Sequence, residues 1–397
     1  MLDSIYIGMS GLTAYSKGLQ TISNNVANLN TAGFKTSTPR FADLHYGQQF
    51  AQGAPGSTNT MFAGTGVEYG YASMNFTQGD LRSSSGQLDL AIQGNGLLTL
   101  LDGPTARYAR TGQFAMENDG AIRDKATGLQ LATLTASGGL AGLSIAGKQI
   151  NPPKATTVVR FADNLSTGSK SFSIPNIDVY DANGGKHTLK LDFAPDSSVI
   201  PGRWKVSVTD ENNQPVQEDA LRFVGGVVEP GRDRINVTLR PGDAPPFTVS
   251  LDFSSGVTSF SAGTTSTLRV ASKDGYATGT LSSLGVDQDG LLTLKYSNGQ
   301  TDRLGAIALA HFANPQQLIQ LGNGLFDATH AAGPEYRASN GPGVGTLQSG
   351  ATEASNVDLS TEFGQLILIQ RGFQASSQVI STANEMIMQL FQMRGQG

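Results

Sequence analysis

In the stretch LILIQRGFQASSQVISTANEMIMQL, residues 366–390, the apolar or small positions alternate in spacing between three and four residues. Such spacing is typical of a helix that packs along a heptad seam. The seam leaves most of the helix surface polar, so the helix needs a partner along its length. Its positions are Leu366, Ile369, Phe373, Ser376, Ile380, Ala383, Ile387 and Leu390.

The beginning of the chain carries a second seam that matches the first. Apolar side chains recur every seven residues and a second line lies between them, so we predict a helix over about residues 4–29 with Asp3 or Ser4 as its N-cap. The matched seams predict that 1–30 and 360–397 form a helical coiled-coil assembly domain. The alternative is an ordinary antiparallel helix pair that caps a globular domain. The N-terminal positions are Ile5, Leu12, Leu19 and Val26, together with Tyr15, Ile22 and Leu29.

Glycine interrupts both predicted helices, at positions 8, 11 and 18 in the first and at 364 and 372 in the second. Each glycine lowers helix stability by roughly 1 kcal/mol relative to alanine. We therefore predict helices that are weak alone, stay largely disordered in a free subunit and become ordered on assembly.

The composition indicates about two or three domains with a substantial core. Among 397 residues, 27 Lys and Arg oppose 32 Asp and Glu, the formal net charge is -5, and the basic residues are scattered. This distribution predicts no nucleic-acid surface and no anionic-lipid surface. The sequence has no cysteine, and we expect neither a cleavable signal peptide nor membrane insertion.

Between its two ends the chain has the pattern of short strands joined by tight turns. Apolar residues alternate through 88–92 and through 177–193, and turn sequences occur at Asp119-Gly120, Asn298-Gly299 and 181–185. We predict a mainly β fold with α-helical termini. Its parts are an inner discontinuous β-domain (71–165 and 272–330), an outer inserted antiparallel β-barrel or sandwich (166–271), and extended connectors (31–70 and 331–359).

The residue patterns of enzymes and metal sites are missing from the sequence. Asp287, Asp289 and Gly290 match a calcium loop only in part and predict an Asp-Gly turn, and the G-x-G of Gly94 and Gly96 predicts a strand bend, not a phosphate loop. We therefore expect no catalytic residues, no metal and no cofactor. The histidines, His45, His187, His311 and His330, lack metal-ligand spacing.

Several blocks resemble the family of bacterial flagellar rod and hook proteins. The N-terminal signature of that family is matched by Asn24, Asn25, Ala27, Asn28, Gly33, Phe34 and Lys35. FTQGDLRSSSGQLDLAIQGNGLLTL (76–100) and RYARTGQF (107–114) are similar to its first-strand segment. GVDQDGLLTLKYSNGQTDRLGAIALAHFANPQQL (285–318) and QRGF (370–373) narrow the resemblance to the hook proteins. The C-terminal block EASNVDL supplies Glu353, Ser355, Asn356, Val357, Asp358 and Leu359.

The resemblance implies a structural subunit that polymerises into a helical tube, with both terminal helices in its inner layer. Such a tube acts as a universal joint that transmits motor torque from rod to filament. The implied partners are further copies of the chain, the distal rod protein, the hook-filament junction protein, the hook cap and the flagellar type III export apparatus. The implied location is the extracellular hook, reached without a cleaved signal peptide.

Two other functions remain open at this point. A distal rod protein shares the N-terminal signature but is a shorter chain without the 166–271 insert. A secreted β-rich adhesin or enzyme explains the hairpins but not the matched terminal seams.

Overall fold

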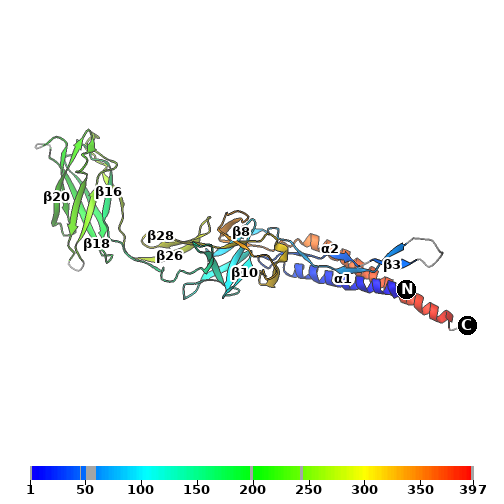
Figure 1. Cartoon of the computed structure of the whole chain (residues 1–397). Coiled ribbons are helices and arrows are strands. Elements are labelled where there is room, and N and C mark those ends of the chain that lie inside the picture. Colours follow the sequence, from blue (N-terminus) through cyan, green and yellow to red (C-terminus); the bar gives the residue numbers. More distant parts are fainter. Residues whose placement is uncertain (1, 45, 51–59, 197–199, 242–244, 395–397) are drawn as a thin grey trace. The chain divides into compact units, whose positions relative to one another are not determined.

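The computed structural model describes residues 2–44, 46–50, 60–196, 200–241 and 245–394. Its described part contains one long helix near each end, α1 (Leu2–Ala27) and α2 (Leu359–Arg394), with strands between them (Figure 1). The prediction of Asp3 or Ser4 as N-cap is wrong, because α1 already includes Leu2. Asp3 lies in the first turn instead, where the helix dipole favours an acidic side chain.

The chain divides into two compact units. Unit 1 contains Met1–Ala146, Leu284–Thr293 and Arg303–Gly397, and unit 2 contains Gly147–Ser283 and Leu294–Asp302. Both units are discontinuous in sequence. We describe each one by itself.

Unit 1 is built on a 12-stranded sheet with the order β30-β31-β10-β9-β13-β12-β11-β8-β33, to which β14, β29 and β32 are added. Its central strands are buried on both faces, as in β8 and β9, and a turn with Gly120 at φ +81° joins β11 to β12 as predicted. The strands are β8 (Asp89–Gln93), β9 (Leu97–Asp102), β10 (Thr105–Ala109), β11 (Thr111–Met116), β12 (Ile122–Asp124), β13 (Gln130–Leu134), β14 (Leu140–Gly142), β29 (Leu309–His311), β30 (Ile319–Gly322), β31 (Leu325–Asp327), β32 (Glu335–Arg337) and β33 (Thr346–Ser349). The 3-10 helix η1 (Pro315–Gln317) precedes β30.

Short strand pairs involve the segments that we predicted as extended connectors, 31–70 and 331–359. They are β1 (Ser37–Thr38) with β6 (Ser73–Met74), β2 (Phe41–Asp43) with β5 (Val67–Tyr69), β3 (Tyr46–Phe50) with β4 (Thr60–Gly64), and β7 (Leu81–Ser83) with β34 (Ala351–Glu353). The last pair is formed by segments far apart in the sequence. β6 and β7 lie outside the predicted connectors, and the segment 331–359 also contributes β32 and β33 to the 12-stranded sheet. His45 lies outside the described residues.

Unit 2 consists mainly of a 10-stranded sheet with the order β17-β18-β19-β20-β21-β24-β16-β23-β22, with β25 added to β16. Strands such as β19 and β22 alternate buried and exposed residues, so one face of each strand points into a single core. The strands are β16 (Val158–Asn164), β17 (Phe172–Tyr180), β18 (Lys186–Pro195), β19 (Arg203–Thr209), β20 (Pro215–Val224), β21 (Val227–Val228), β22 (Arg234–Leu239), β23 (Phe247–Asp252), β24 (Val257–Thr258) and β25 (Arg269–Lys273).

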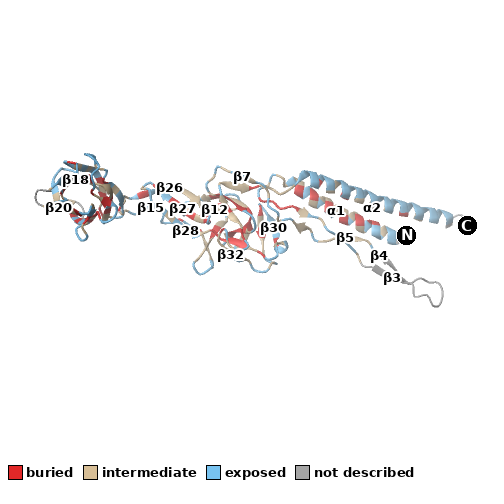
Figure 2. Cartoon of the chain, turned by 90° about the horizontal axis from the view of Figure 1, so that it is seen from above, coloured by how far each residue is buried: buried red, intermediate tan, exposed pale blue. Residues whose placement is uncertain are grey.

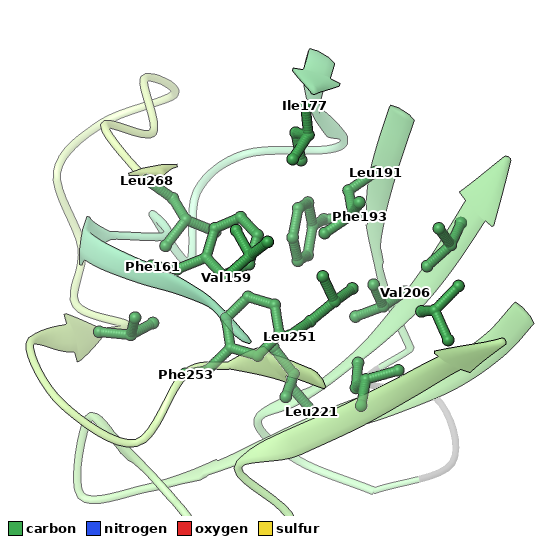
Figure 3. Packing of buried hydrophobic residues seen from close by; sticks show 14 of the residues in the cluster. Val159, Phe161, Ile177, Leu191, Phe193, Val206, Leu221, Leu251, Phe253 and Leu268 are labelled. Atoms are coloured by element: carbon green, nitrogen blue, oxygen red, sulfur yellow. The ribbon is translucent and has the colours of Figure 1, made fainter. Parts of the chain in front are cut away.

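The core of unit 2 is aromatic at its centre (Figure 3). The ring of Phe253 stacks on Phe161 with centroids 4.5 Å apart and meets Phe193 edge-on at 6.2 Å. Aliphatic side chains from β18, β19, β20 and β23 surround these rings. Trp204 also lies in this core and is 3% exposed.

The sheet of unit 2 departs from the predicted antiparallel pattern at one strand. β16 pairs in parallel with β23 and with β24. Because β16 reaches its neighbours through long stretches of chain rather than through hairpins, no tight turn forces it to be antiparallel. β16 precedes residue 166, so the sheet of unit 2 begins before the insert range of 166–271.

A smaller sheet has the order β15-β26-β27-β28, and residues of these strands are divided between the two units. The predicted turns are present here: Gly299 at φ +78° joins β27 to β28, and Gly290 donates its N–H to the Asp287 carbonyl oxygen. The strands are β15 (Ile150–Asn151), β26 (Gly279–Val286), β27 (Leu291–Tyr296) and β28 (Thr301–Ala306).

Candidate assembly site at the joined chain ends

The two terminal helices pack against each other in antiparallel orientation (Figure 1). Gly8 lies against Ile380, Gly11 against Ser376, and Gly18 against Ile369. A Cβ atom on Gly8 would fall 2.7 Å from Cγ1 of Ile380, and one on Gly11 would fall 2.5 Å from Oγ of Ser376. Glycine therefore allows the backbone of α1 to approach α2 closely, a role that the propensity argument did not reveal.

The residues at the predicted seam positions differ in how far they are buried in this helix pair. Ile22 and Ile369 are buried, whereas Phe373 and Leu390 are exposed. The position of α2 that faces Tyr15 is Gly372, one residue before Phe373. Ala383 is also buried. The remaining predicted residues are half-buried: Ile5, Leu12, Tyr15, Leu19, Val26, Leu29, Leu366, Ser376, Ile380 and Ile387.

Sequence reasoning missed the most buried row of α1, which consists of small residues. Gly8, Gly11, Ala14 and Gly18 are buried, and they continue through Ile22 to Asn25. The apolar heptad lines flank this row. The recurrence of small residues at intervals of three and four was the available signal.

Strand β5 and its partner β2 hold α1 from another side. The hydroxyl groups of Thr21 and Tyr69 lie 2.6 Å apart, and Oγ of Ser10 accepts a hydrogen bond from the Val67 N–H. The Phe41 ring lies between Tyr15 and Tyr69, at centroid distances of 5.3 and 6.2 Å. The segment predicted as a connector thus packs on the helix that precedes it.

Large apolar side chains remain uncovered on the helix pair. Figure 2 shows that much of both helices is exposed. Leu368 is 69% exposed and Phe391 is 67% exposed, although both belong to a well-formed helix. Large exposed apolar areas are typical of surfaces that contact a partner. We call these residues the apolar helix surface: Tyr6, Ile7 and Met9 of α1, with Phe363, Ile367, Leu368, Phe373, Val379, Met386, Met388, Leu390, Phe391 and Met393 of α2.

A buried ion cluster joins the segments that follow α1 and precede α2. The Lys35 ammonium lies 2.5 Å from Oε1 of Glu353, and Nε of Arg110 lies 2.8 Å from Oε2. The side chains of Lys35 and Glu353 are fully buried. Arg110 follows β10, so the cluster ties both chain ends to the 12-stranded sheet.

Backbone groups complete the coordination of this cluster. The Gly79 N–H donates to Oε1 of Glu353, and Lys35 donates to the Thr77 carbonyl oxygen at 2.6 Å. Arg110 donates to the carbonyl oxygens of Gly96 and Ile92. Every charged atom of the cluster therefore has a hydrogen-bond partner, as burial of charge requires.

Two asparagines of the signature blocks form further bridges between distant segments. Asn25 donates to Oε2 of Glu362 at 3.0 Å and accepts a hydrogen bond from the Ser37 N–H. Asn356 accepts from the Thr36 N–H and donates to the carbonyl oxygens of Asn75 and Thr77. Both amides fix the path of the chain where it leaves a helix or enters one.

The other signature residues shape the helix ends. Asn28 donates to the Asn24 carbonyl oxygen at the end of α1, where Ala27 is the last helical residue. Gly33 has φ +69°, and its N–H donates to the Glu353 carbonyl oxygen. Phe34 is buried.

At the start of α2, Asp358 caps the helix. Its carboxylate accepts hydrogen bonds from the Ser360 N–H and the Thr361 hydroxyl. Ser355 Oγ accepts a hydrogen bond from the Val357 N–H, and Leu359 is the first residue of α2. These contacts are all local, as is typical of an N-cap.

Burial shifts the pKa values of two charged groups where the chain leaves α1 and enters α2, Lys35 and Glu362. Burial lowers the pKa of Lys35, an effect that the neighbouring Glu353 carboxylate opposes. Burial raises the pKa of Glu362, which has only the Asn25 amide as an opposing influence. At the surface, the hydrogen bond from Thr361 lowers the pKa of Asp358.

The described residues include no group of three or more His, Cys, Asp or Glu side chains that could hold a metal ion. His187, one of the histidines that lack metal-ligand spacing in the sequence, pairs with Asp181 at 3.0 Å in unit 2. None of the helices in the described part has the length and hydropathy of a membrane-spanning helix.

Comparison with known families matches three parts of the chain. The model of the flagella basal body rod protein matches residues 5–35, and that of the flagellar basal body rod FlgEFG protein C-terminal region matches residues 348–393. The model of the flagellar basal body protein FlaE D2 domain matches residues 150–276. The first two matches contain the helix pair and the ion-cluster residues Lys35 and Glu353, and all three are models of flagellar axial proteins.

Individual relatives give a more specific result. The flagellar hook protein FlgE of Escherichia coli is 31% identical over 97% of this chain and 98% of its own length. That of Salmonella typhimurium is 30% identical over 97% of this chain and 98% of its own. The crystal structure of Helicobacter pylori FlgE2 aligns with a TM-score of 0.48 and 14% identity over 67% of this chain and 99% of that one.

The chain belongs to the flagellar hook protein family. It is accordingly a structural protein of the bacterial flagellum, and its place is the hook.

Proposed function

We propose that this chain polymerises through its terminal helices into the tube of the flagellar hook. The single observation that supports this most strongly is the apolar helix surface. A free soluble subunit gains nothing from leaving side chains such as Leu368 and Phe391 in water. Burial of apolar surface contributes about 25 cal/mol per Å², so contact with a second copy stabilises both.

The unequal lengths of the two helices support a head-to-tail contact. α1 has 26 residues and α2 has 36. Because Gly8 lies level with Ile380, Leu2 lies level with about residue 386 (380 plus 6). Residues of α2 after 386 thus extend beyond the described start of α1. They include Met388, Leu390, Phe391 and Met393, all at least half exposed.

An apolar end that fits a different part of the next copy makes a heterologous contact, and repetition of such a contact produces an open helix. This explains how one sequence forms a tube of indefinite length. The predicted seam residues, including those exposed at Phe373 and Leu390, then belong to the contacts between copies as well as within one copy.

We assign one role to each predicted domain. The ends 1–30 and 360–397 assemble, and 31–70 with 331–359 connect them to the inner β-domain of 71–165 and 272–330. The insert 166–271, together with β16 before it and the end of β25 after it, forms the outer domain, whose polar strand faces allow copies to slide as the tube bends. The tube then serves as a flexible universal joint that passes motor torque from rod to filament, with no catalytic step.

The resemblance to hook proteins supports the proposed partners. Besides further copies of itself, the chain contacts the distal rod protein at one end of the tube and the hook-filament junction protein at the other. Assembly occurs under the hook cap. Export is through the flagellar type III apparatus without a cleaved signal peptide, to an extracellular position.

The decisive experiment examines purified protein by sedimentation and negative-stain electron microscopy. Leu390→Gln removes an apolar side chain from the extending end of α2 and should abolish tubes. Gln389→Ala, the matched control, removes a polar side chain of similar length and should assemble normally. Tubes formed by a chain that lacks 1–30 and 360–397 would rule out assembly through the helices.

A further inference from the structure

The ion cluster of Lys35, Arg110 and Glu353 joins three segments that are remote in the sequence. Lys35 lies eight residues after the last residue of α1, and Glu353 lies six residues before the first residue of α2. Lys35 and Glu353 are separated by 318 residues. Arg110 belongs to the β-domain between β10 and β11.

The cluster has two cations but a single anion. Within the described residues, neither Lys35 nor Arg110 forms an ion pair with another carboxylate. If Glu353 left its place, the two cations would remain buried together with only backbone carbonyl oxygens as partners. Removal of one member from a buried ion pair is strongly destabilising for this reason.

Backbone hydrogen bonds depend on the same residue. The Gly33 N–H donates to the Glu353 carbonyl oxygen at 2.8 Å, and the Gly79 N–H donates to its side chain at 2.9 Å. Next to these, the Thr36 N–H donates to the Asn356 side chain at 2.9 Å. Two backbone donors of the segment after α1, the N–H groups of Gly33 and Thr36, are therefore satisfied by the segment before α2.

We propose that Glu353 couples the ordering of the two chain ends at their exits from the inner β-domain. We define the exit segments as residues 33–36 and 353–356. Neither exit segment can leave the β-domain without opening the other, so both ends are released or fixed together. This coupling is a property of the single subunit and is independent of how subunits assemble.

The coupling has to be reciprocal, because the free energy that links two sites is the same from either side. A substitution in one exit segment must therefore loosen the other, which is remote in sequence. Packing of α1 on α2 alone does not predict an effect at 33–36 from a change of charge at 353. The amide groups of Gly33, Thr36 and Gly79 are direct reporters.

The test is hydrogen–deuterium exchange of the full chain, read by peptide or by residue. In Glu353→Gln, exchange of the amides at 33–36 and of Gly79 should accelerate on the order of 100-fold, as expected for a broken buried ion pair. In Lys35→Met, the amides of 353–356 should accelerate by a similar factor. The matched control is Glu362→Gln, which neutralises another buried carboxylate of the same chain end, outside the cluster, and should leave 33–36 unchanged.

Two results would overturn the coupling. One is fast exchange at 353–356 in Glu353→Gln while 33–36 stay protected as in the wild type. The other is an equal effect of Glu362→Gln on 33–36. If the amides of β8, β9 and β13 also lose protection in Glu353→Gln, the β-domain itself has opened, and the Glu353→Asp variant is used instead. Aspartate keeps the charge but is too short to reach both cations, so accelerated 33–36 exchange supports the coupling and wild-type exchange there refutes it.

Discussion

The ring of Tyr15 lies against the backbone of Gly372, so closely that a Cβ atom on this glycine would fall 2.6 Å from the ring atom Cζ. The adjacent ring atoms Cε1 and Cε2 would lie 2.8 and 3.0 Å away. The rigid ring cannot bend aside, so a larger residue at 372 forces the helices apart. This contact shows that the helix pair depends on glycine for its close approach.

Gly372→Ala should therefore destabilise the helix pair despite the better helix propensity of alanine. Overpacking costs typically about 1–3 kcal/mol, against a gain of about 1 kcal/mol in propensity. Gly364→Ala is the control, because a Cβ atom there would have no neighbour within 4 Å. Urea unfolding followed by far-UV circular dichroism should show the two alanines acting in opposite directions. Equal stabilisation by both would contradict the close contact.

Ile380→Asp should separate α2 from α1 while the β-domains stay folded. The side chain of Ile380 is half-buried against Gly8, so the substitution would place a charge in the helix contact. We expect loss of helical circular dichroism and of tubes in electron microscopy. Gln378→Asp introduces the same charge at an exposed position of α2 and should retain both. Unfolding of the whole chain by Ile380→Asp would instead favour a helix pair that caps a single globular domain.

The contact between Glu362 of α2 and Asn25 of α1 should stabilise the folded chain more at mildly acidic pH than at neutral pH. Burial raises the pKa of Glu362 above the usual value of 4.5, so the folded state takes up a proton before the unfolded state does. The resulting stability is fully present below the usual pKa and is lost as pH rises through the folded-state pKa. Glu362→Gln keeps an oxygen that can accept the Asn25 hydrogen bond.

The measurement for Glu362 compares urea midpoints of wild type and Glu362→Gln across this pH range. The variant should be more stable than the wild type at neutral pH, and the difference should shrink toward acidic pH. A difference that is independent of pH would show that the carboxylate does not titrate in this window.

Phe253→Ala should destabilise unit 2 by about 3–5 kcal/mol, the usual cost of removing a buried aromatic side chain. The loss includes the stacked contact with Phe161 and the edge contact with Phe193. Trp204 is the single tryptophan of the chain and lies in the same core, so its fluorescence reports the unfolding of unit 2 alone. Val224→Ala, at an exposed position of β20, should change the fluorescence midpoint little. A similar shift for both variants would contradict the aromatic core.

The amino-acid sequence was sufficient to predict the elements that depend on local periodicity. Heptad spacing predicted helices at both ends, alternation predicted strands, and Asp-Gly and Asn-Gly pairs predicted turns at Gly120, Gly290 and Gly299. These signals are readable because each depends on residues close together in the chain. The resemblance to flagellar rod and hook proteins likewise depended on short blocks of consecutive residues.

The contacts that the residues of those blocks make could be seen only in the folded chain. Lys35 and Glu353 were noticed as signature residues, but their ion pair spans 318 residues and also involves Arg110. Arg110 lies in the block 107–114, but nothing in that block pointed to a contact with Glu353. The glycines of α1 were interpreted as weakening a helix, and their role in close packing became visible only with Ile380, Ser376 and Ile369 opposite them. Whether a small residue is a defect or a contact depends on the partner surface, and the position of that surface is set by the folding of the whole chain.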